Sequence, residues 1–294
     1  MKLYTIEYQN TIQLAAAFSE ADVLYPLIPN GIAHADMQSL IENWSEALAS
    51  SIYALEKKPD AEKVSISDIR IKAPIMRPRQ DVICLGINYY DHATEAAKFS
   101  SEAFGGERPK TIYFSKRVTE APGTGDSIPS HSDVVKELDY ESELAVILGK
   151  TALNVSKENA LDYVFGYTII NDITAREVQT AHKQWYRGKS FDGFTPMGPC
   201  IVTADDIPDP QTLKICARVN GETRQESHTS LMMQDVAGAV SELSTGMTLL
   251  PGTIISTGTP AGVGMGFDPP KFLKHGDVVE CEVERIGTLV NTID

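Results

Sequence analysis

From residue 81 to residue 293 the chain consists mainly of short runs in which apolar and polar residues alternate. Because successive side chains of a strand point to opposite faces, this period of two predicts strands with one buried face. Asn220-Gly221 within 213–224 predicts a tight hairpin turn. Helical composition is limited here to 174–185 and the start of 234–252, so the pattern predicts a β-rich fold. The other predicted strands lie within 81–86, 111–117, 139–150, 165–173, 253–266 and 277–293.

The first 75 residues are organised differently. Residues 4–9 alternate like a strand, and apolar residues recur every three or four positions from Asp36 to Lys58, which is typical of an amphipathic helix capped by Asp36. A short alternating run at 64–71 is followed by the prolines of 73–80, which break the pattern. We therefore expect an α+β fold with a small N-terminal domain over 1–75 and a β-rich domain over 76–294.

The charge of the chain argues against two classes of partner. Its 294 residues hold 26 Lys and Arg against 40 Asp and Glu, a formal net charge of −14. Nucleic acids and anionic membranes bind clustered Lys and Arg, so neither is an expected partner. No apolar run approaches the roughly 18–20 residues of a membrane span. Glu7, Gln9 and Asn10 interrupt the N-terminal segment where a signal peptide would be apolar, so we expect a cytoplasmic protein.

Three acidic residues stand where two predicted strands can bring them together. Glu141 and Glu143 lie two residues apart in the run 139–150, on the face that also carries Asp139. Asp172 ends another predicted strand. Carboxylates on one strand face repel each other unless they are solvated or a cation offsets them. The pattern leaves two interpretations open: an exposed, charged strand end, or a site for a hard cation such as Mg²⁺, Mn²⁺ or Ca²⁺.

Three further segments carry polar groups suited to chemistry. His92 and Glu95 are spaced i and i+3, which on a helix makes them either a base with its orienting carboxylate or a surface ion pair. Lys189 lies in a glycine-flanked loop and is either solvated or placed to stabilise an oxyanion. The run 256–264 can present backbone amides to an anion. It matches neither a P-loop nor G-x-G-x-x-G, so nucleotide binding is not expected there.

Five segments, taken in chain order, resemble the fumarylacetoacetate hydrolase family. They are GINYYDHATE at 86–95, DYESELAVILGK at 139–150, GYTIINDITAREVQ at 166–179, GKSFDGFTPMGP at 188–199 and STGTPAGVG at 256–264. The resemblance extends from about residue 81 to the C-terminus. It implies a roll of mixed β-sheets, usually a homodimer, preceded in many bacterial members by a small N-terminal domain.

The resemblance also implies roles for individual positions. Three carboxylates match the family's metal ligands, which usually hold Mg²⁺ or Mn²⁺: Glu141, Glu143 and Asp172. Three residues match its catalytic groups, a dyad on a lid segment and an active-site lysine: His92, Glu95 and Lys189. Two residues match positions that contact the oxo-acid end of the substrate: Gln179 and Thr259.

These matches imply an enzyme acting on a small keto acid chelated by the metal. Family members hydrolyse C–C bonds of acylpyruvates, decarboxylate oxaloacetate-like acids, or isomerise hydroxymuconate-type diacids. Because the dyad favours making a nucleophile from water, we predict hydrolysis of a C–C bond in an acylpyruvate or related β-diketo acid. Decarboxylation or isomerisation is the alternative, and an inactive binding protein on the same scaffold is the alternative of another class. The segment 88–110, with Gly105-Gly106 and a stretch at 96–109 longer than the compact family version, is predicted to be a mobile lid.

Overall fold

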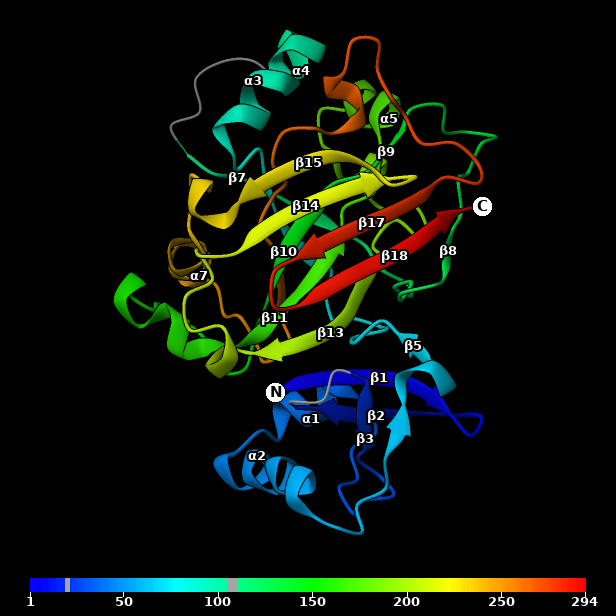
Figure 1. Ribbon diagram of the computed structural model, residues 1–294. Helices are drawn as coiled ribbons and strands as arrows, with labels where there is room; N and C mark the ends of the chain where they lie inside the picture. The colour runs from blue at the N-terminus through cyan, green and yellow to red at the C-terminus, as the bar shows by residue number, and fades with distance from the viewer. Residues whose placement is uncertain (19–21, 105–109) are drawn as a thin grey trace.

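The computed structural model describes residues 1–18, 22–104 and 110–294, and it has the β-rich, mixed-sheet architecture predicted from the sequence (Figure 1). The large sheet has the strand order β4-β3-β2-β1-β13-β11-β10-β16-β6-β7, with β5 paired to β1. Its strands are β1 Lys2–Tyr8, β2 Thr11–Ala17, β3 Val23–Pro26, β4 Val64–Ser65, β5 Arg70–Lys72, β6 Val82–Gly86, β7 Ile112–Lys116, β10 Ser142–Leu148, β11 Val164–Asn171, β13 Met197–Thr203 and β16 Ile254–Ser256.

A second sheet, in the order β15-β14-β17-β18-β8, packs against the middle of the first. Its strands are β8 Ser127–Ile128, β14 Lys214–Val219, β15 Glu222–His228, β17 Val278–Val283 and β18 Gly287–Ile293. A separate two-stranded ladder pairs β9 Leu138–Asp139 with β12 Thr174–Ala175. The predicted hairpin is confirmed between β14 and β15, where Asn220 and Gly221 have φ of 51° and 77°, as a tight turn of this kind requires.

Helices cover the ends and edges of the sheets. They are α1 Met37–Glu42, α2 Glu46–Tyr53, α3 Tyr90–Phe99, α4 Ser101–Phe104, α5 Arg176–Ala181, α6 Tyr186–Lys189 and α7 Val236–Ser244. Short 3₁₀ turns occupy 54–57, 66–68, 157–163, 204–206, 229–231 and 264–266. Among the described residues, no helix combines the length and apolar character needed to cross a bilayer.

Strand β10 lies between two apolar cores because its side chains alternate. Leu144 and Val146 belong to the core shared with the second sheet, whereas Ala145 and Ile147 pack into a core that also holds residues of α1 and α2. Glu143 has the same parity as Ala145, so the strand carries its carboxylate on the second of these faces. Polar side chains at this end of β10 are therefore buried in the middle of the large sheet.

The N-terminal part lies beside the rest of the molecule in Figure 1, but it is joined to it by backbone pairing. Strand β1 pairs with β13, with Lys2 opposite Val202 and Leu3 opposite Ile201. One apolar core also contains residues from both sides of position 75. The division into 1–75 and 76–294 therefore stays a prediction.

Two predicted elements differ from the structure. The single helix expected over 36–58 is two helices, because Ser45 accepts a hydrogen bond from the Leu48 amide and starts α2 as a separate helix. Asp36 does cap α1, as predicted. The continuous strand expected over 139–150 is broken between β9 and β10, where the Asp139 carboxylate accepts the Gly264 amide and leaves the face of the large sheet.

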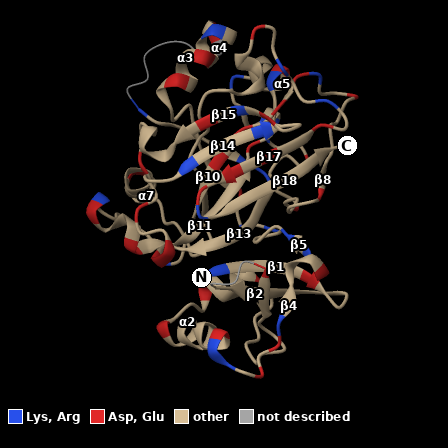
Figure 2. Ribbon diagram, viewed as in Figure 1, with Lys and Arg blue, Asp and Glu red and all other residues tan. Residues whose placement is uncertain are grey.

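Charged residues of both signs are interspersed on the outer strands (Figure 2). On the second sheet, Arg218 of β14 pairs with Glu282 of β17 at 2.7 Å. Exposed pairs of this kind contribute little to stability. The expectation that no nucleic acid binds this protein stays a prediction.

Candidate active site

Three buried carboxylates meet where the ends of β10 and β11 lie side by side. Glu141, Glu143 and Asp172 each place one oxygen within 4.8 Å of the others. Glu143 belongs to β10, Glu141 precedes it, and Asp172 directly follows β11, which pairs with β10. The sequence-based prediction that these three residues lie together is therefore confirmed by the geometry. Of the two interpretations left open by the sequence, the exposed strand end is excluded, because all three residues are at most 5% exposed.

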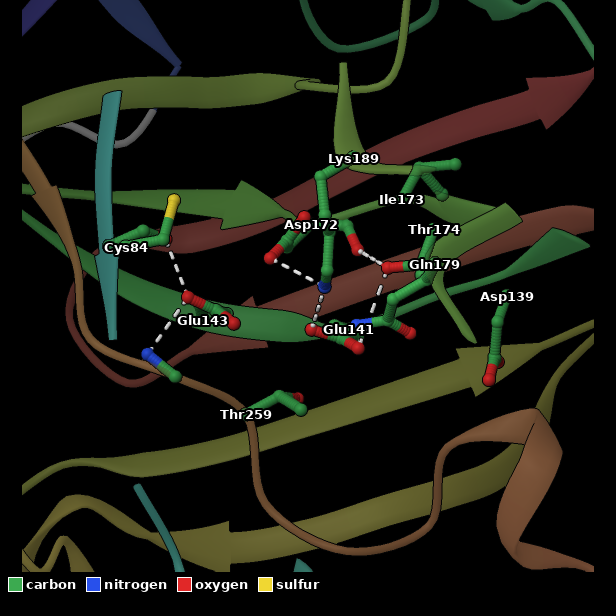
Figure 3. A network of polar contacts seen from close by, with 12 residues as sticks. Cys84, Asp139, Glu141, Glu143, Asp172, Ile173, Thr174, Gln179, Lys189 and Thr259 are labelled. Carbon is green, nitrogen blue, oxygen red and sulfur yellow. Dashed lines mark hydrogen bonds and ion pairs between the residues drawn. The ribbon is translucent and has the colours of Figure 1, made fainter. Parts of the chain in front are cut away.

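Three buried cations surround the carboxylates. Lys189, at the end of the one-turn helix α6, points between Glu141 and Asp172 and donates to an oxygen of each at 2.8 Å (Figure 3). Lys116, the last residue of β7, donates to the other Asp172 oxygen and to the Ile173 carbonyl. Arg176, at the start of α5, contacts Glu141 through Nη1 at 2.7 Å. Figure 3 also shows that Asp139 lies apart from this group.

These charges act unequally on the carboxyl groups. Burial opposes ionisation of Glu141, but Lys189 and Arg176 outweigh it and lower its pKa to about 2. Burial and the neighbouring charges of Asp172 and Glu141 raise the pKa of Glu143 well above its usual range. Within the described residues Glu143 has no ion pair, and its carboxylate accepts only the Ser256 hydroxyl at 2.6 Å and the Gly258 amide at 2.9 Å.

The carboxylate group fits a hard divalent cation. A six-coordinate ion with ligand distances of about 2.0–2.1 Å places its oxygen ligands roughly 3–4 Å apart, which is compatible with this spacing. All three donors are carboxylate oxygens, the ligand type preferred by Mg²⁺ and Mn²⁺. Glu143 is the member whose charge the protein leaves without an ion pair, so a cation at this position would stabilise its ionised form.

Helix α3 places the predicted dyad over the same site. His92 is buried, and its Nδ1 lies 3.1 Å from a carboxylate oxygen of Glu95, one turn further along α3. Both Glu141 and His92 line one small cavity, whose volume is about 20 Å³, close to the space of a single water molecule. Gly105 and Gly106, which belong to the predicted lid, lie outside the described residues.

The cavity also receives the two predicted substrate contacts. Gln179 of α5 is buried and accepts a hydrogen bond from Arg176 at 3.2 Å. Thr259 follows β16, and its hydroxyl donates to the Ser142 carbonyl and accepts from Gln225. The apolar part of the lining combines aliphatic side chains with three aromatic ones: Phe104, Phe114 and Trp185. The structure thus brings all eight predicted site residues to one region.

The sequence analysis missed two residues and misplaced a third. Lys116 lies two residues after Phe114 on β7, so both side chains are on the same face of the strand. Because Phe114 lines the cavity, this spacing is a local signal that Lys116 faces the site. Arg176 begins a helix and carries no such signal. Asp139 is not a neighbour of the carboxylate group. Arg176 binds it through Nε at 2.8 Å, and it accepts the amides of Tyr140, Gly264 and Met265.

Comparisons with known proteins agree with this geometry. A family model described as fumarylacetoacetate (FAA) hydrolase C-terminal matches residues 81–294. A Bacillus subtilis (strain 168) protein named oxaloacetate tautomerase YisK is 47% identical over 264 residues, which are 87% of this chain and 86% of that protein.

Two solved structures are similar over the whole chain. A fumarylacetoacetate hydrolase from the psychrophile Exiguobacterium antarcticum matches with a TM-score of 0.83 and 38% identity, covering 100% of this chain and 99% of that one. A maleylpyruvate hydrolase from Sphingobium sp. SYK-6, in complex with manganese(II) and pyruvate, matches with a TM-score of 0.79 and 28% identity, covering 100% and 98%. The similarity therefore includes the N-terminal part as well as residues 81–294.

Proposed function

The chain belongs to the fumarylacetoacetate hydrolase family, and on that premise we propose that it is a divalent-metal-dependent tautomerase of an oxaloacetate-like keto diacid. The observation that supports this proposal is the contact of the half-buried Glu95 with the buried His92, which lines a small cavity together with Glu141 and Glu143. Interconversion of enol and keto forms moves a proton between oxygen and carbon and adds no water. The similarity to a protein named oxaloacetate tautomerase supports the same reaction class.

The proposed metal ligands are Glu141, Glu143 and Asp172, and the ions that suit them are Mg²⁺ and Mn²⁺. When bound there, such an ion would act as a Lewis acid and make the C–H beside the keto group of the acid more acidic. Lys189 keeps a positive charge beside Glu141 and Asp172, since those carboxylates outweigh burial and raise its pKa. That charge stabilises negative charge that develops on the substrate oxygen.

His92 is the proposed proton carrier. Its Nδ1 faces Glu95, so Nε2 is the ring nitrogen left to take a proton from the substrate and return it. Glu95 holds the proton on Nδ1 and stabilises the imidazolium that forms. Gln179 and Thr259, which line the cavity, are the proposed contacts to the oxo-acid end of the substrate.

Hydrolysis of a C–C bond, predicted from the sequence, is the second candidate. It is supported by the similarity to a maleylpyruvate hydrolase solved with manganese and pyruvate. Hydrolysis requires a water molecule between His92 and the substrate in addition to the groups above. Tautomerisation needs only the groups already named, and of these two relatives the oxaloacetate tautomerase is the more similar in sequence, at 47% against 28% identity.

The test is an assay of purified, Mn²⁺-loaded protein on the enol form of oxaloacetate, followed by the loss of enol absorbance. Parallel assays measure pyruvate release from oxaloacetate and cleavage of acylpyruvates. We expect the protein to accelerate enol loss over the buffer rate, and we expect this acceleration to be lost in Glu143→Ala. Cleavage of an acylpyruvate without acceleration of enol loss would replace the proposal by the second candidate. The predicted homodimer is tested separately by light scattering.

A further inference from the structure

Glu95 makes a second contact that ties the dyad to a distant part of the chain. One of its carboxylate oxygens faces His92, and the other accepts the backbone amide of Gly262 at 2.9 Å. Gly262 has a φ of 100°, and an added Cβ would lie 1.9 Å from the Arg224 carbonyl oxygen, so only glycine fits there. The carboxylate of Glu95 is thus fixed at both oxygens, one by the imidazole and one by the loop.

Gly266 leaves the space into which this carboxylate fits. A Cβ built at Gly266 would lie 1.7 Å from Oε1 of Glu95 and 2.0 Å from its Cδ. The three atoms nearest to that Cβ all belong to the Glu95 side chain, and the backbone at Gly266 does not have a positive φ. A methyl group at this position would therefore displace the Glu95 carboxylate and leave the loop backbone unstrained.

The loop is held by the two residues that precede the proposed ligand Glu141. The Tyr140 hydroxyl donates to the Gly262 carbonyl at 2.7 Å. The Asp139 carboxylate accepts the amides of Gly264 at 2.6 Å and Met265 at 3.1 Å. One short segment thus carries a proposed metal ligand and also fixes the loop that receives Glu95.

We propose that the loop 262–266 positions the dyad, with the Gly262 amide and the space at Gly266 holding Glu95, and with Asp139 and Tyr140 fixing the loop relative to Glu141. The expected fall in kcat rests on the proposed function. Its structural consequence, the bond between Gly262 and Glu95, is independent of which reaction the enzyme catalyses. Gly262, Gly266, Asp139 and Tyr140 are positioning residues that do not touch the substrate.

The decisive variant is Gly266→Ala, compared with Glu95→Ala and with the double variant. We expect kcat for enol loss to fall by about 10²-fold in Gly266→Ala, since misplacing a catalytic group by about 1 Å costs about that factor. Affinity for Mn²⁺, measured by calorimetry, is expected to stay unchanged. In the Glu95→Ala background the second substitution is expected to add nothing, because the side chain it displaces is absent.

A readout that does not depend on activity is hydrogen exchange of the Gly262 amide, followed by NMR. We expect exchange to accelerate in Gly266→Ala and in Glu95→Ala, and to do so even if the wild-type protein acts on another substrate. Unchanged exchange of this amide in Gly266→Ala, or an unchanged kcat in an active enzyme, would overturn the inference. Full additivity of the two substitutions would overturn it as well.

A matched control is Gly238→Ala in α7, where the atoms nearest to the added Cβ also belong to side chains, with oxygens of Asp235 and Gln234 at 2.8 Å. We expect this variant to leave kcat and the rate of hydrogen exchange of the Gly262 amide unchanged. If Gly266→Ala does not fold, Tyr140→Phe is the second variant, because it removes the hydroxyl that anchors Gly262. We expect it to lower kcat and to accelerate exchange of the Gly262 amide, and the absence of both effects would contradict the proposal.

Discussion

The carboxylate group and helix α3 carry the two halves of the same site, but they are built in different ways. Glu143 lies on β10, which pairs with β11 on one side and β16 on the other, and Glu143 is 1% exposed. In α3 only His92 and Ala96 are buried, while Tyr90 is 73% exposed. Strand pairing fixes the first region, whereas the second is held by a small apolar cluster around Ala96 and by the contact of Glu95 with the loop at 262–266.

This contrast separates the expected effects of substitutions. Changes in the carboxylate group should alter metal binding and stability together, because the same buried charges serve both. Changes in α3 should alter the rate and leave both of those properties in place. Local stability is lowest where few apolar contacts are buried, which makes α3 the part expected to open for a substrate.

The largest expected effect is loss of the metal in Glu143→Ala. The substitution removes one of three carboxylates, so we expect the affinity for Mn²⁺ to fall by more than about 100-fold and activity to disappear while the protein still folds. Calorimetric titration and elemental analysis measure the binding of Mn²⁺, and circular dichroism shows whether the variant folds. Glu222→Ala, at an exposed glutamate of β15, is the control. Full metal content in Glu143→Ala would contradict the site.

The next effect separates rate from binding. His92→Ala should lower kcat for enol loss by about 10²–10⁴-fold, the usual contribution of a general acid–base, with Mn²⁺ affinity unchanged. The exposed His275 provides the control variant, His275→Ala, which is expected to keep both properties. If kcat is unchanged in His92→Ala, a group other than His92 transfers the proton.

The third effect concerns stability. Lys116→Met leaves an oxygen of Asp172 and the Ile173 carbonyl without a buried donor, and we expect the free energy of unfolding to fall by about 3–5 kcal/mol. Lys98→Met, at an exposed position of α3, should change it by less than about 0.5 kcal/mol. Urea unfolding in the presence of a chelator measures both. Equal changes in the two variants would remove the contrast between the regions.

The smallest effect is in backbone dynamics. Amides of α3 should exchange hydrogen faster than those of β10, and addition of Mn²⁺ with oxalate, a keto-acid analogue, should slow exchange in α3 alone. Exchange measured by mass spectrometry over 90–99 and 142–148 tests this. Identical exchange of α3 with and without oxalate would argue against a closing lid.

Several features of the molecule follow from short stretches of sequence. The turn at Asn220-Gly221 forms because both residues tolerate positive φ, and the cap at Asp36 forms because its side chain accepts the Ser39 amide three residues later. Alternation along 139–150 was enough to predict that Glu141 and Glu143 lie together. In each case the deciding interaction spans only a few residues, so the pattern of residue types contains it.

Long-range contacts decided the rest. The amide of Gly262 that holds Glu95 is 167 residues away in the chain, and the carboxylate of Asp139 is bound by Arg176, 37 residues on. No periodicity reports such pairs, because a buried charge is placed by whichever partner the fold brings near it. The sequence by itself determined most of the strands, the turn and the identity of the candidate ligands. Only the tertiary structure decided how cations and loops fix those ligands and the dyad in one cavity.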